Sequence, residues 1–411
     1  MNRTSVKSSD CHSATSIFFR ATATSVVVFI FATWASAAPP SPSSSFSGLG
    51  FLPGGGALSN ASAISADGSV VVGGALSAFG SEAFRWTSAV GMVGLGDLPG
   101  GQRWSFAYGV SANGSVVTGA SRTMVNPGGA FPIADQGFRW TASGGMVALG
   151  TLAGGTGSLA YGTSADGSVI AGNGFEYTLF PSGVSSRHDV AARWTSAGGL
   201  VDLAGLGGND GISYGVSADG AVVVGQRSTA FRWTNAGGMQ DLGTLPGPSA
   251  IRSVAYATSA DGSVAVGMSG VSSHGTKAFR WTSAGGMVDL GNLGGTSSSG
   301  DCSALAVSAD GERVVGFSDS PTGRVAFLWT GADGMVSLKD YLIAHGASNL
   351  TGWTLTAAQG ISGNGNTIVG YGRNPAGQSE AWIATVPEPS SVVLALIALL
   401  TFASMARRRW R

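Results

Sequence analysis

Apolar and polar positions in the middle of the chain follow the pattern of short strands separated by tight turns. In residues 212–217 (ISYGVS) apolar and small side chains alternate, as in a half-buried strand. Residues 219–220 (DG) then stand between two strand-like runs, a hairpin signal that predicts a type I′ turn with positive φ at both centres. The next strands are expected at 222–224, 230–234 (AFRWT) and 239–242. The pattern predicts a four-stranded antiparallel meander, without a convincing helix in any unit.

This unit occurs seven times along the chain. The element SADGSVVVG appears, with variation, at Ser65–Gly73, Ser111–Gly119, Ser164–Gly172, Ser217–Gly225, Ser259–Gly267, Ser308–Gly316 and Ser362–Gly370. The AFRWT element is marked by Trp86, Trp140, Trp194, Trp233, Trp281 and Trp329. Its seventh copy, AWIAT, has Trp382 in the Phe position and Ala384 in the Trp position. A third element, GGMVDLGxLxGG, is clearest at residues 285–295.

Unit length and strand number together predict the architecture. Trp86 and Trp329 are 243 residues apart over five intervals, or about 49 residues each, and seven four-stranded units of that length are typical of a β-propeller. A β-solenoid is the alternative, although its coils are usually shorter and its open ends need caps. The fourth-strand element is missing after Trp382, and a spare copy stands at Phe46–Gly50. We therefore expect an all-β, seven-bladed propeller of four-stranded antiparallel blades over residues 46–385, with an N-terminal strand closing the last blade.

Residues within the FRWT element alternate between the two faces of the strand. Phe84 and Trp86 should face a neighbouring blade, where they would supply apolar burial at the junction, while Arg85 faces the other way. The arginine recurs at Arg139, Arg193, Arg232 and Arg280 and becomes Leu328 and Ile383 in the last two units. We expect it either to bond a carbonyl or the acidic residue of the SADG turn, or to remain solvated at the strand end.

The N-terminus has the features of a secretory signal peptide. Basic residues precede the uncharged apolar run 25–34, and the small residues Ala35-Ser36-Ala37 follow it. We expect residues 1–37 to be a signal peptide cut near Ala37/Ala38 and residues 38–45 to be a flexible linker; an uncleaved anchor helix is the alternative.

The distribution of charge supports neither nucleic-acid binding nor disorder. Residues 1–37 and 390–411 hold 7 of the 22 Lys and Arg but 1 of the 22 Asp and Glu, so the middle has 15 − 21 = −6 charges.

The C-terminal residues 386–411 have three parts in a fixed order. Pro387-Glu388-Pro389 leads into the uncharged stretch 390–406, and four of the last five residues are arginine. This order resembles the PEP-CTERM sorting signal of Gram-negative bacteria. The resemblance implies a transmembrane helix with cytoplasmic arginines, cleavage by an exosortase-type membrane protease, and a protein that passes from the inner membrane to the cell surface or an extracellular polysaccharide matrix. A permanent C-terminal anchor is the alternative.

The repeats themselves resemble the HAF-type probable extracellular repeat family over about residues 46–385. The AFRW, SADG and LGxLxGG elements carry this resemblance, which implies an exported repeat protein without an established activity. The family's histidine is absent. Its equivalents here are Glu82, Gln136, Val190, Thr229, Lys277, Val325 and Glu380.

Residue types that support catalysis or metal binding are sparse. Three histidines lie beyond the predicted signal peptide, at widely spaced positions 188, 274 and 345, and none has zinc-ligand spacing. The aspartates of the SADG elements suit turns better than calcium loops, which need several oxygen ligands in close succession. Cys302 would be the one cysteine of the mature chain, and we expect it to be buried in a strand. Neither a metal nor a cofactor is expected.

The connection between the second and third strands is long in two units, over residues 120–137 and 173–190. Long connections on a rigid scaffold are where function concentrates. Candidate ligand contacts on this face are Trp104, Phe175, Tyr177, Phe180 and His188. We expect a non-catalytic exported protein that binds polysaccharide or protein there. The alternatives are connections that only pack on their own blades, a polysaccharide hydrolase or lyase using carboxylates such as Glu176 and Asp189, and a purely structural matrix component.

Overall fold

The computed structural model describes residues 43–124, 133–179, 185–203, 211–246, 250–271, 275–294 and 300–387. The chain divides into two units, Met1–Ser41 and Pro42–Arg411, and all described residues belong to the second. The predicted signal peptide, the tail from Glu388 onwards, Phe180 and His274 lie outside the described residues. Within the described part of the chain, no helix is both long enough and apolar enough to cross a membrane.

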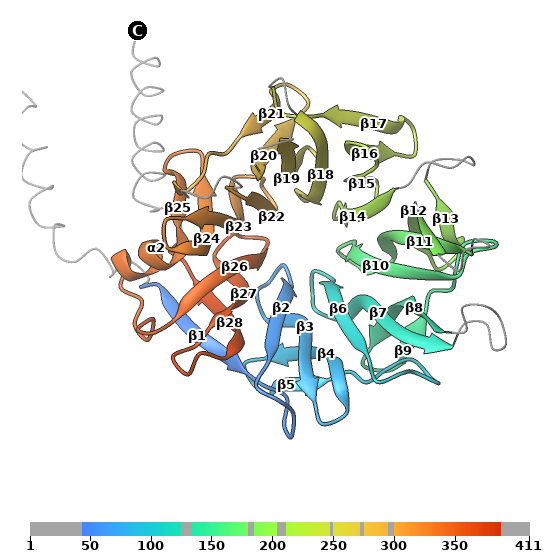
Figure 1. Ribbon diagram of the computed structural model, residues 1–411, viewed down its shortest axis with the longest axis horizontal. Helices are drawn as coiled ribbons and strands as arrows, with labels where there is room; N and C mark the ends of the chain where they lie inside the picture. The colour runs from blue at the N-terminus through green and yellow to red at the C-terminus, as the bar shows by residue number, and fades with distance from the viewer. Residues whose placement is uncertain are drawn as a thin grey trace, which may run out of the picture. The chain divides into compact units, whose positions relative to one another are not determined.

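Seven four-stranded antiparallel sheets lie around a common centre in the second unit (Figure 1). Six of them follow chain order, from β2-β3-β4-β5 to β22-β23-β24-β25, and we number these blades 1 to 6. The seventh has the order β1-β28-β27-β26, so its outer strand comes from the start of the ring. The structure is a seven-bladed β-propeller, and the predicted fold and closure are confirmed.

Blade 1 consists of β2 (Ser59–Ile64), β3 (Val70–Ser77), β4 (Gly80–Thr87) and β5 (Gly91–Gly94). Blade 2 consists of β6 (Ser105–Val110), β7 (Val116–Met124), β8 (Ile133–Thr141) and β9 (Gly145–Ala148). Blade 3 consists of β10 (Gly157–Thr163), β11 (Val169–Leu179), β12 (Ser185–Thr195) and β13 (Gly199–Asp202). Blade 4 consists of β14 (Ile212–Val216), β15 (Val222–Gln226), β16 (Ala230–Thr234) and β17 (Gly238–Gly243). Blade 5 consists of β18 (Ala250–Thr258), β19 (Val264–Val271), β20 (Gly275–Thr282) and β21 (Gly286–Asp289). Blade 6 consists of β22 (Cys302–Val307), β23 (Arg313–Ser320), β24 (Gly323–Thr330) and β25 (Gly334–Ser337). Blade 7 consists of β26 (Thr354–Ile361), β27 (Thr367–Arg373), β28 (Ser379–Thr385) and β1 (Ser45–Gly50).

Strand β1 joins the two ends of the ring. It pairs antiparallel with β28, with Gly48 opposite Trp382, and the side chains of Phe46 and Leu49 are buried. The predicted linker 38–45 is wrong in its last two residues. Ser45 already belongs to β1, and the Ser44 N–H donates to the His345 carbonyl at 3.0 Å. These residues are ordered because pairing satisfies backbone groups that a linker would leave to water.

The SADG turns differ from the predicted type I′ geometry. In Ser65-Ala66-Asp67-Gly68 the Gly68 N–H donates to the Ser65 carbonyl, and only the glycine has positive φ, at 77°. The buried Ser65 Oγ accepts from the Val70 N–H at 2.9 Å and donates to Asp67. The aspartate caps the turn with its side chain, and it avoids the left-handed region that a type I′ turn would require of it.

The same turns connect all seven blades by backbone hydrogen bonds. The residue after each turn serine donates its N–H to the equivalent carbonyl of the next blade, at 2.8–3.0 Å. The donors are, in order, Ala66, Ala112, Ala165, Ala218, Ala260, Ala309 and Gly363, and Gly363 donates back to Ala66. This closed circle means that every blade is held on both sides at the turn face, which is the face of the ring that carries the SADG turns.

Aromatic side chains fill the junctions between blades, as predicted. The Phe positions of the AFRWT element are 0–2% exposed at Phe84, Phe138, Phe231, Phe279 and Phe327. Phe138 and the partly buried Trp140, for example, pack against Val70 and Val72 of the preceding blade. In blade 7 the larger Trp382 takes the Phe position and is completely buried.

The recurring arginines bond the turn glycine of the following blade, which confirms the carbonyl alternative. Their guanidinium groups donate to the carbonyls of Gly114, Gly167, Gly220, Gly262 and Gly311 at 3.0–3.5 Å, from Arg85, Arg139, Arg193, Arg232 and Arg280. In blade 6, where Leu328 replaces the arginine, Arg313 of β23 donates to the equivalent Gly365 carbonyl at 2.9 Å. A different residue therefore supplies the same contact.

One helix contradicts the expectation of an all-strand unit. Helix α2 (Leu338–Ala344) follows blade 6, with Ser337 as its N-cap accepting from the Asp340 N–H. Leu338 and Leu342, one helical turn apart, are completely buried. The segment is only seven residues long, so its stability comes from packing that the local pattern does not reveal.

The turn aspartates predict a specific dependence of stability on pH. Hydrogen bonds from Ser164 and Ser168 lower the pKa of Asp166 to about 2, and Ser259 and Ser263 do the same for Asp261. A depressed pKa in the folded state stabilises the fold above the ordinary pKa of about 3.9, and this stabilisation is lost as the pH falls toward 2. We expect a double variant, Asp166→Asn with Asp261→Asn, to lose less stability between pH 4 and pH 2 than the parent.

Asparagine is a matched replacement because Asn113 and Asn364 already occupy the same turn position, where their Oδ1 atoms accept the equivalent bonds. Urea unfolding at pH 4, 3 and 2 would measure the slopes. Identical slopes for parent and variant would show that these carboxylates do not control acid stability.

Candidate functional site

The connections between second and third strands, and those from each fourth strand to the next blade, emerge opposite the turn face; we call this side the loop face. Two predicted long loops on it are mostly paired strand. In blade 2 the pairing continues to Met124 opposite Ile133, and in blade 3 it continues to Leu179 opposite Ser185. The expectation of loops over 120–137 and 173–190 is therefore wrong, because pairing within each extended hairpin satisfies the backbone beyond the blade body.

Three of the predicted contact residues come together at the loop face. Trp104, before β6, and Tyr177, on β11, pack against the same buried residues as Tyr108 of β6 and Tyr161 of β10. Phe175 belongs to the same cluster but is only 2% exposed, and it meets Tyr177 edge-on at 5.7 Å between ring centroids. Phe175 therefore supports the partly buried Trp104 and Tyr177 and does not itself offer a surface to a ligand. We call Trp104, Phe175, Tyr177, Tyr108 and Tyr161 the rim cluster.

Arginine side chains cover the rim cluster on its solvent side. The Arg122 guanidinium lies 5.0 Å from the Trp104 ring centroid and pairs with Asp135 at 2.9 Å. In blade 3 the Arg187 guanidinium lies 4.0 Å from the Phe175 centroid and pairs with Asp189 at 2.7 Å. Each arginine thus combines a cation–π contact with an ion pair, which places hydrogen-bonding groups beside the aromatic surfaces.

The two carboxylates of the catalytic alternative do not face each other. Phe175 is opposite Asp189 in the β11–β12 hairpin, and Glu176 is opposite the half-buried His188. Because neighbouring residues of a strand point to opposite faces, Glu176 and Asp189 lie on different sides of the hairpin. Asp189 also accepts from Arg187 and from Asn173 Nδ2. His188 is likewise directed away from Phe175, so the structure separates it from the rim cluster.

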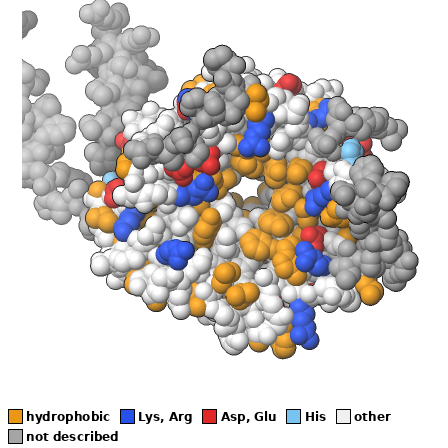
Figure 2. All heavy atoms as spheres, in the orientation of Figure 1, with side chains coloured by type: hydrophobic (Ala, Val, Ile, Leu, Met, Phe, Trp, Pro, Cys, Tyr) orange, Lys and Arg blue, Asp and Glu red, His pale blue; other side chains and the backbone are white. Residues whose placement is uncertain are grey.

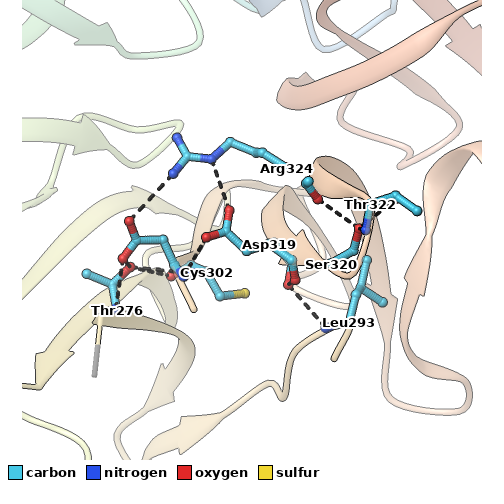
Figure 3. Close-up of polar contacts among 10 residues, drawn as sticks. Thr276, Leu293, Cys302, Asp319, Ser320, Thr322 and Arg324 are labelled. Carbon is cyan, nitrogen blue, oxygen red and sulfur yellow. Dashed lines mark hydrogen bonds and ion pairs between the residues drawn. The ribbon is translucent and has the colours of Figure 1, made fainter. Parts of the chain in front are cut away.

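A second arginine cluster, in blade 6, was not found from the sequence. The Arg324 guanidinium contacts Asp319 at 3.4 Å (Figure 3) and Asp301 at 3.5 Å. It also lies 4.0 Å from the Phe317 ring centroid. Backbone N–H groups hold both carboxylates, since Asp301 donates to Asp319 Oδ2 and Thr276 donates to Asp301 Oδ1, each at 3.1 Å. The groups come from blades 5 and 6, so no local spacing in the sequence indicates the cluster.

Large apolar side chains are exposed at several strand ends of the loop face. These are Leu58, Phe79, Met124 and Ile251, at 44–69% exposure. Figure 2 shows hydrophobic side chains gathered along one side of the central opening. These four residues belong to blades 1, 2 and 5, and singly exposed apolar side chains are normal on a protein surface, so they do not by themselves mark a contact site.

The central channel is the other feature that sequence reasoning missed. It has a volume of about 550 Å³ and is lined by the first strands of the blades. The residue three positions before each turn serine lies in this wall: Ser62, Tyr108, Tyr161, Tyr214, Tyr256, Leu305 and Gln359. Four consecutive tyrosines therefore occupy one side, and we call them the tyrosine arc. The sequence could have indicated the tyrosine arc, because a tyrosine stands at the same repeat position in four successive units.

Burial sets the chemistry of the tyrosine arc. It raises the pKa of Tyr214 to about 12 and also raises the pKa values of Tyr108, Tyr161 and Tyr256. Their hydroxyls are consequently neutral hydrogen-bonding groups at physiological pH. No charged side chain is among the described residues that line the channel.

Metal and thiol chemistry find no support among the described residues. They contain no group of three or more His, Cys, Asp or Glu that could hold a metal ion. Cys302 is 1% exposed, as expected, and burial raises the pKa of its thiol to about 11. Its Sγ lies 3.7 Å from the Gly291 carbonyl, the place taken by serine hydroxyls in other blades, such as Ser105. Cys302 is thus a structural replacement for serine.

Neither a protein-family model nor a curated protein matches this chain. Among solved structures, TolB from Acinetobacter baumannii is similar with 12% identity and a TM-score of 0.40, over 73% of this chain and 64% of that one. The periplasmic gluconolactonase PpgL from Pseudomonas aeruginosa has 16% identity and a TM-score of 0.37, over 81% of this chain and 97% of that one. The Dos1 propeller has 10% identity and a TM-score of 0.43, over 82% and 93%. Likeness at this level carries no conclusion about activity.

Proposed function

We propose that this protein binds polysaccharide, without catalysing a reaction on it, through the loop face of the propeller. The observation that carries the proposal is the rim cluster, in which Trp104 of the connection into blade 2 and Tyr177 of blade 3 pack against the same buried residues. Aromatic rings present flat apolar surfaces to the C–H faces of sugars, and Tyr and Trp add a polar edge. The nearby pairs Arg122–Asp135 and Arg187–Asp189 supply donors and acceptors for sugar hydroxyls.

The place of action is part of the same proposal. The signal-peptide pattern of residues 1–37 supports export, and the likeness of residues 386–411 to a PEP-CTERM tail supports transient anchoring in the inner membrane of a Gram-negative bacterium. An exosortase-type protease would then release the ring to the cell surface or extracellular matrix. The likeness to HAF-type repeats supports the same extracellular setting. Detection of the chain in culture medium, lost on replacing Pro387 and Pro389, would test this route.

Binding should depend on Trp104 and Tyr177, the two partly buried aromatics of the rim cluster that lie outside the channel. We expect Trp104→Ala and Tyr177→Ala each to weaken binding to a polysaccharide about tenfold or more, since a central aromatic contact contributes at least about 1.4 kcal/mol. The measurement is retention on a panel of immobilised polysaccharides containing dextran, mannan, cellulose and polygalacturonate. Circular dichroism and thermal unfolding of each variant would show that the ring is intact.

Tyr341→Ala is the matched control, because Tyr341 is a partly buried aromatic on α2 and stacks on His345, away from the rim cluster. Its binding should equal that of the parent. Failure of the parent to bind any member of the panel, or equal binding by both rim variants, would contradict the proposed function. The opposed directions of Glu176 and Asp189 give no support to the catalytic alternative, which turnover abolished by Glu176→Gln would revive.

A further inference from the structure

The tyrosine arc forms a continuous aromatic wall inside the channel. Ring centroids of Tyr108 and Tyr161 are 5.1 Å apart, those of Tyr161 and Tyr214 are 5.1 Å apart, and those of Tyr214 and Tyr256 are 5.3 Å apart. Phe106 extends the row, 5.1 Å from Tyr108. Each tyrosine comes from a different blade, so the wall spans more than half of the ring although its members are far apart in the sequence.

The other side of the channel has no aromatic side chain and combines polar with aliphatic residues. At the repeat position of the tyrosines, blades 1, 6 and 7 contribute Ser62, Leu305 and Gln359. The space left between the two sides, about 550 Å³, lies within the range of roughly 300–1,000 Å³ that small-molecule sites occupy. A ligand that fits must offer an apolar face to the tyrosines and hydrogen-bonding groups to Gln359 and the hydroxyls.

The polarity of the lining restricts the ligand further. Because the lining side chains are uncharged and the tyrosine hydroxyls stay protonated, an ionised ligand would lose its hydration without gaining a counter-charge. A pyranose ring without a carboxylate meets every requirement, since it has C–H faces for stacking and hydroxyls around its edge. The lining thus favours a neutral sugar over a uronic acid.

The closed ring restricts how a polymer can enter. Hydrogen bonds run without interruption around the turn face, and β1 joins blade 7 to the start of the chain, so the channel has no lateral opening. A polysaccharide can therefore reach the tyrosine arc only with one of its ends. Tyr108 and Tyr161 pack against the same buried residues as Trp104 and Tyr177, so one buried cluster connects the arc with the aromatics of the loop face.

We propose that the tyrosine arc binds the terminal, uncharged sugar residues of a glycan whose adjoining residues contact Trp104 and Tyr177. The proposal rests on the proposed function and adds the ligand class and the part of the polymer that is recognised. The glycan end stacks on the tyrosines, its hydroxyls bond to their hydroxyls and to Gln359, and the rest of the chain leaves over the loop face.

Two kinds of variant test the channel without altering the loop face. Ser62→Trp places a large side chain on the channel wall of blade 1, next to the Tyr108 end of the arc, and blocks the channel. Tyr214→Leu with Tyr256→Leu removes half of the stacking surface at two tyrosines outside the rim cluster, and the corresponding pair of Tyr→Phe substitutions keeps the rings but removes the hydroxyls. The probes are six-residue oligosaccharides of dextran, mannan, cellulose and polygalacturonate, with binding measured by titration calorimetry and folding checked by thermal unfolding.

We expect one of the neutral hexasaccharides to bind, and Ser62→Trp and the double Leu variant to weaken it at least tenfold. The double Phe variant should lose less than the double Leu variant. Attaching a bulky fluorophore to each end of the hexasaccharide in turn should abolish binding at one end only. If blocked and unblocked channels bind the hexasaccharide equally, or if the polygalacturonate hexasaccharide binds more tightly than the neutral ones, the proposal is overturned.

Failure of this proposal is distinguishable from failure of the proposed function. If the Ser62→Trp variant is retained on immobilised polysaccharide as well as the parent, and the Trp104→Ala variant is not retained, the loop-face function stands and a role for the channel is rejected. Hexasaccharide binding that responds to Ser62→Trp and not to Trp104→Ala would support the channel and reject the loop-face contact. An absence of binding to every polysaccharide and hexasaccharide would reject both.

Discussion

Removal of strand β1 is expected to abolish cooperative folding of the whole ring. Phe46 and Leu49 are 6–7% exposed, and the Phe46 ring centroid lies 5.1 Å from that of Trp353. Losing one buried Phe and one buried Leu costs at least about 5 kcal/mol, which is comparable to the total stability of about 5–15 kcal/mol of a typical domain. The deletion also leaves β28 as an unpaired edge, and such edges pair with other chains.

The experiment compares two truncated chains that differ by the strand alone. A chain beginning at Ser44 retains β1 and should unfold in one sharp transition and elute as a monomer. A chain beginning at Phe51 should be insoluble or aggregated, or should unfold over a broad range at lower temperature. Equal transitions in the two chains would mean that β1 does not close the ring energetically.

A single methyl group at Gly267 should destabilise the protein by at least about 3 kcal/mol, because it forces backbone displacement in a tightly packed sheet. A Cβ there would lie 1.8 Å from the Val254 carbonyl oxygen. The pairing of β18 with β19 shifts between Ala255 and Ala257, and this irregularity brings the carbonyl over the glycine. A Cβ would lie 1.8–2.1 Å from a backbone carbonyl oxygen at the last glycine of every SADGSVVVG element: Gly73, Gly119, Gly172, Gly225, Gly267, Gly316 and Gly370.

Gly331→Ala is the matched control, since a Cβ at Gly331 meets nothing within 4 Å and its φ lies outside the left-handed region. Its stability should stay within about 0.5 kcal/mol of the parent. Urea unfolding monitored by tryptophan fluorescence measures both variants. A Gly267→Ala chain as stable as Gly331→Ala would show that the first strand can move away from the added methyl group.

Local patterns sufficed for the strands and for their closure into a ring. Alternation in residues 212–217, the β-branched run at 222–224 and the AFRWT element each matched an observed strand. The missing fourth-strand element after Trp382 indicated the pairing of β1 with β28. These predictions succeeded because a strand's two-residue period and a turn's need for Asp and Gly act over a few neighbouring residues.

Local patterns failed where the outcome depends on what packs nearby. Residues 173–190 of blade 3 were predicted to be a long loop, yet the pairing of Glu176 with His188 makes this part of the segment strand. Phe175 was predicted to contact ligand, but Arg187 covers its buried ring. Helix α2 went unpredicted because burial of Leu338 and Leu342 stabilises it.

The sequence by itself determined the repeating strand unit, the number of blades and the strand that closes them. The tertiary structure alone decided which side chains meet at the functional face. Tyr161 and Tyr214 are neighbours in space because the ring places equivalent positions of successive blades side by side. Arg324 reaches Asp301 and Asp319 because the ends of β22, β23 and β24 lie next to one another in the sheet of blade 6. Both kinds of contact depend on which strands and blades are neighbours in space, and no short stretch of sequence contains that geometry.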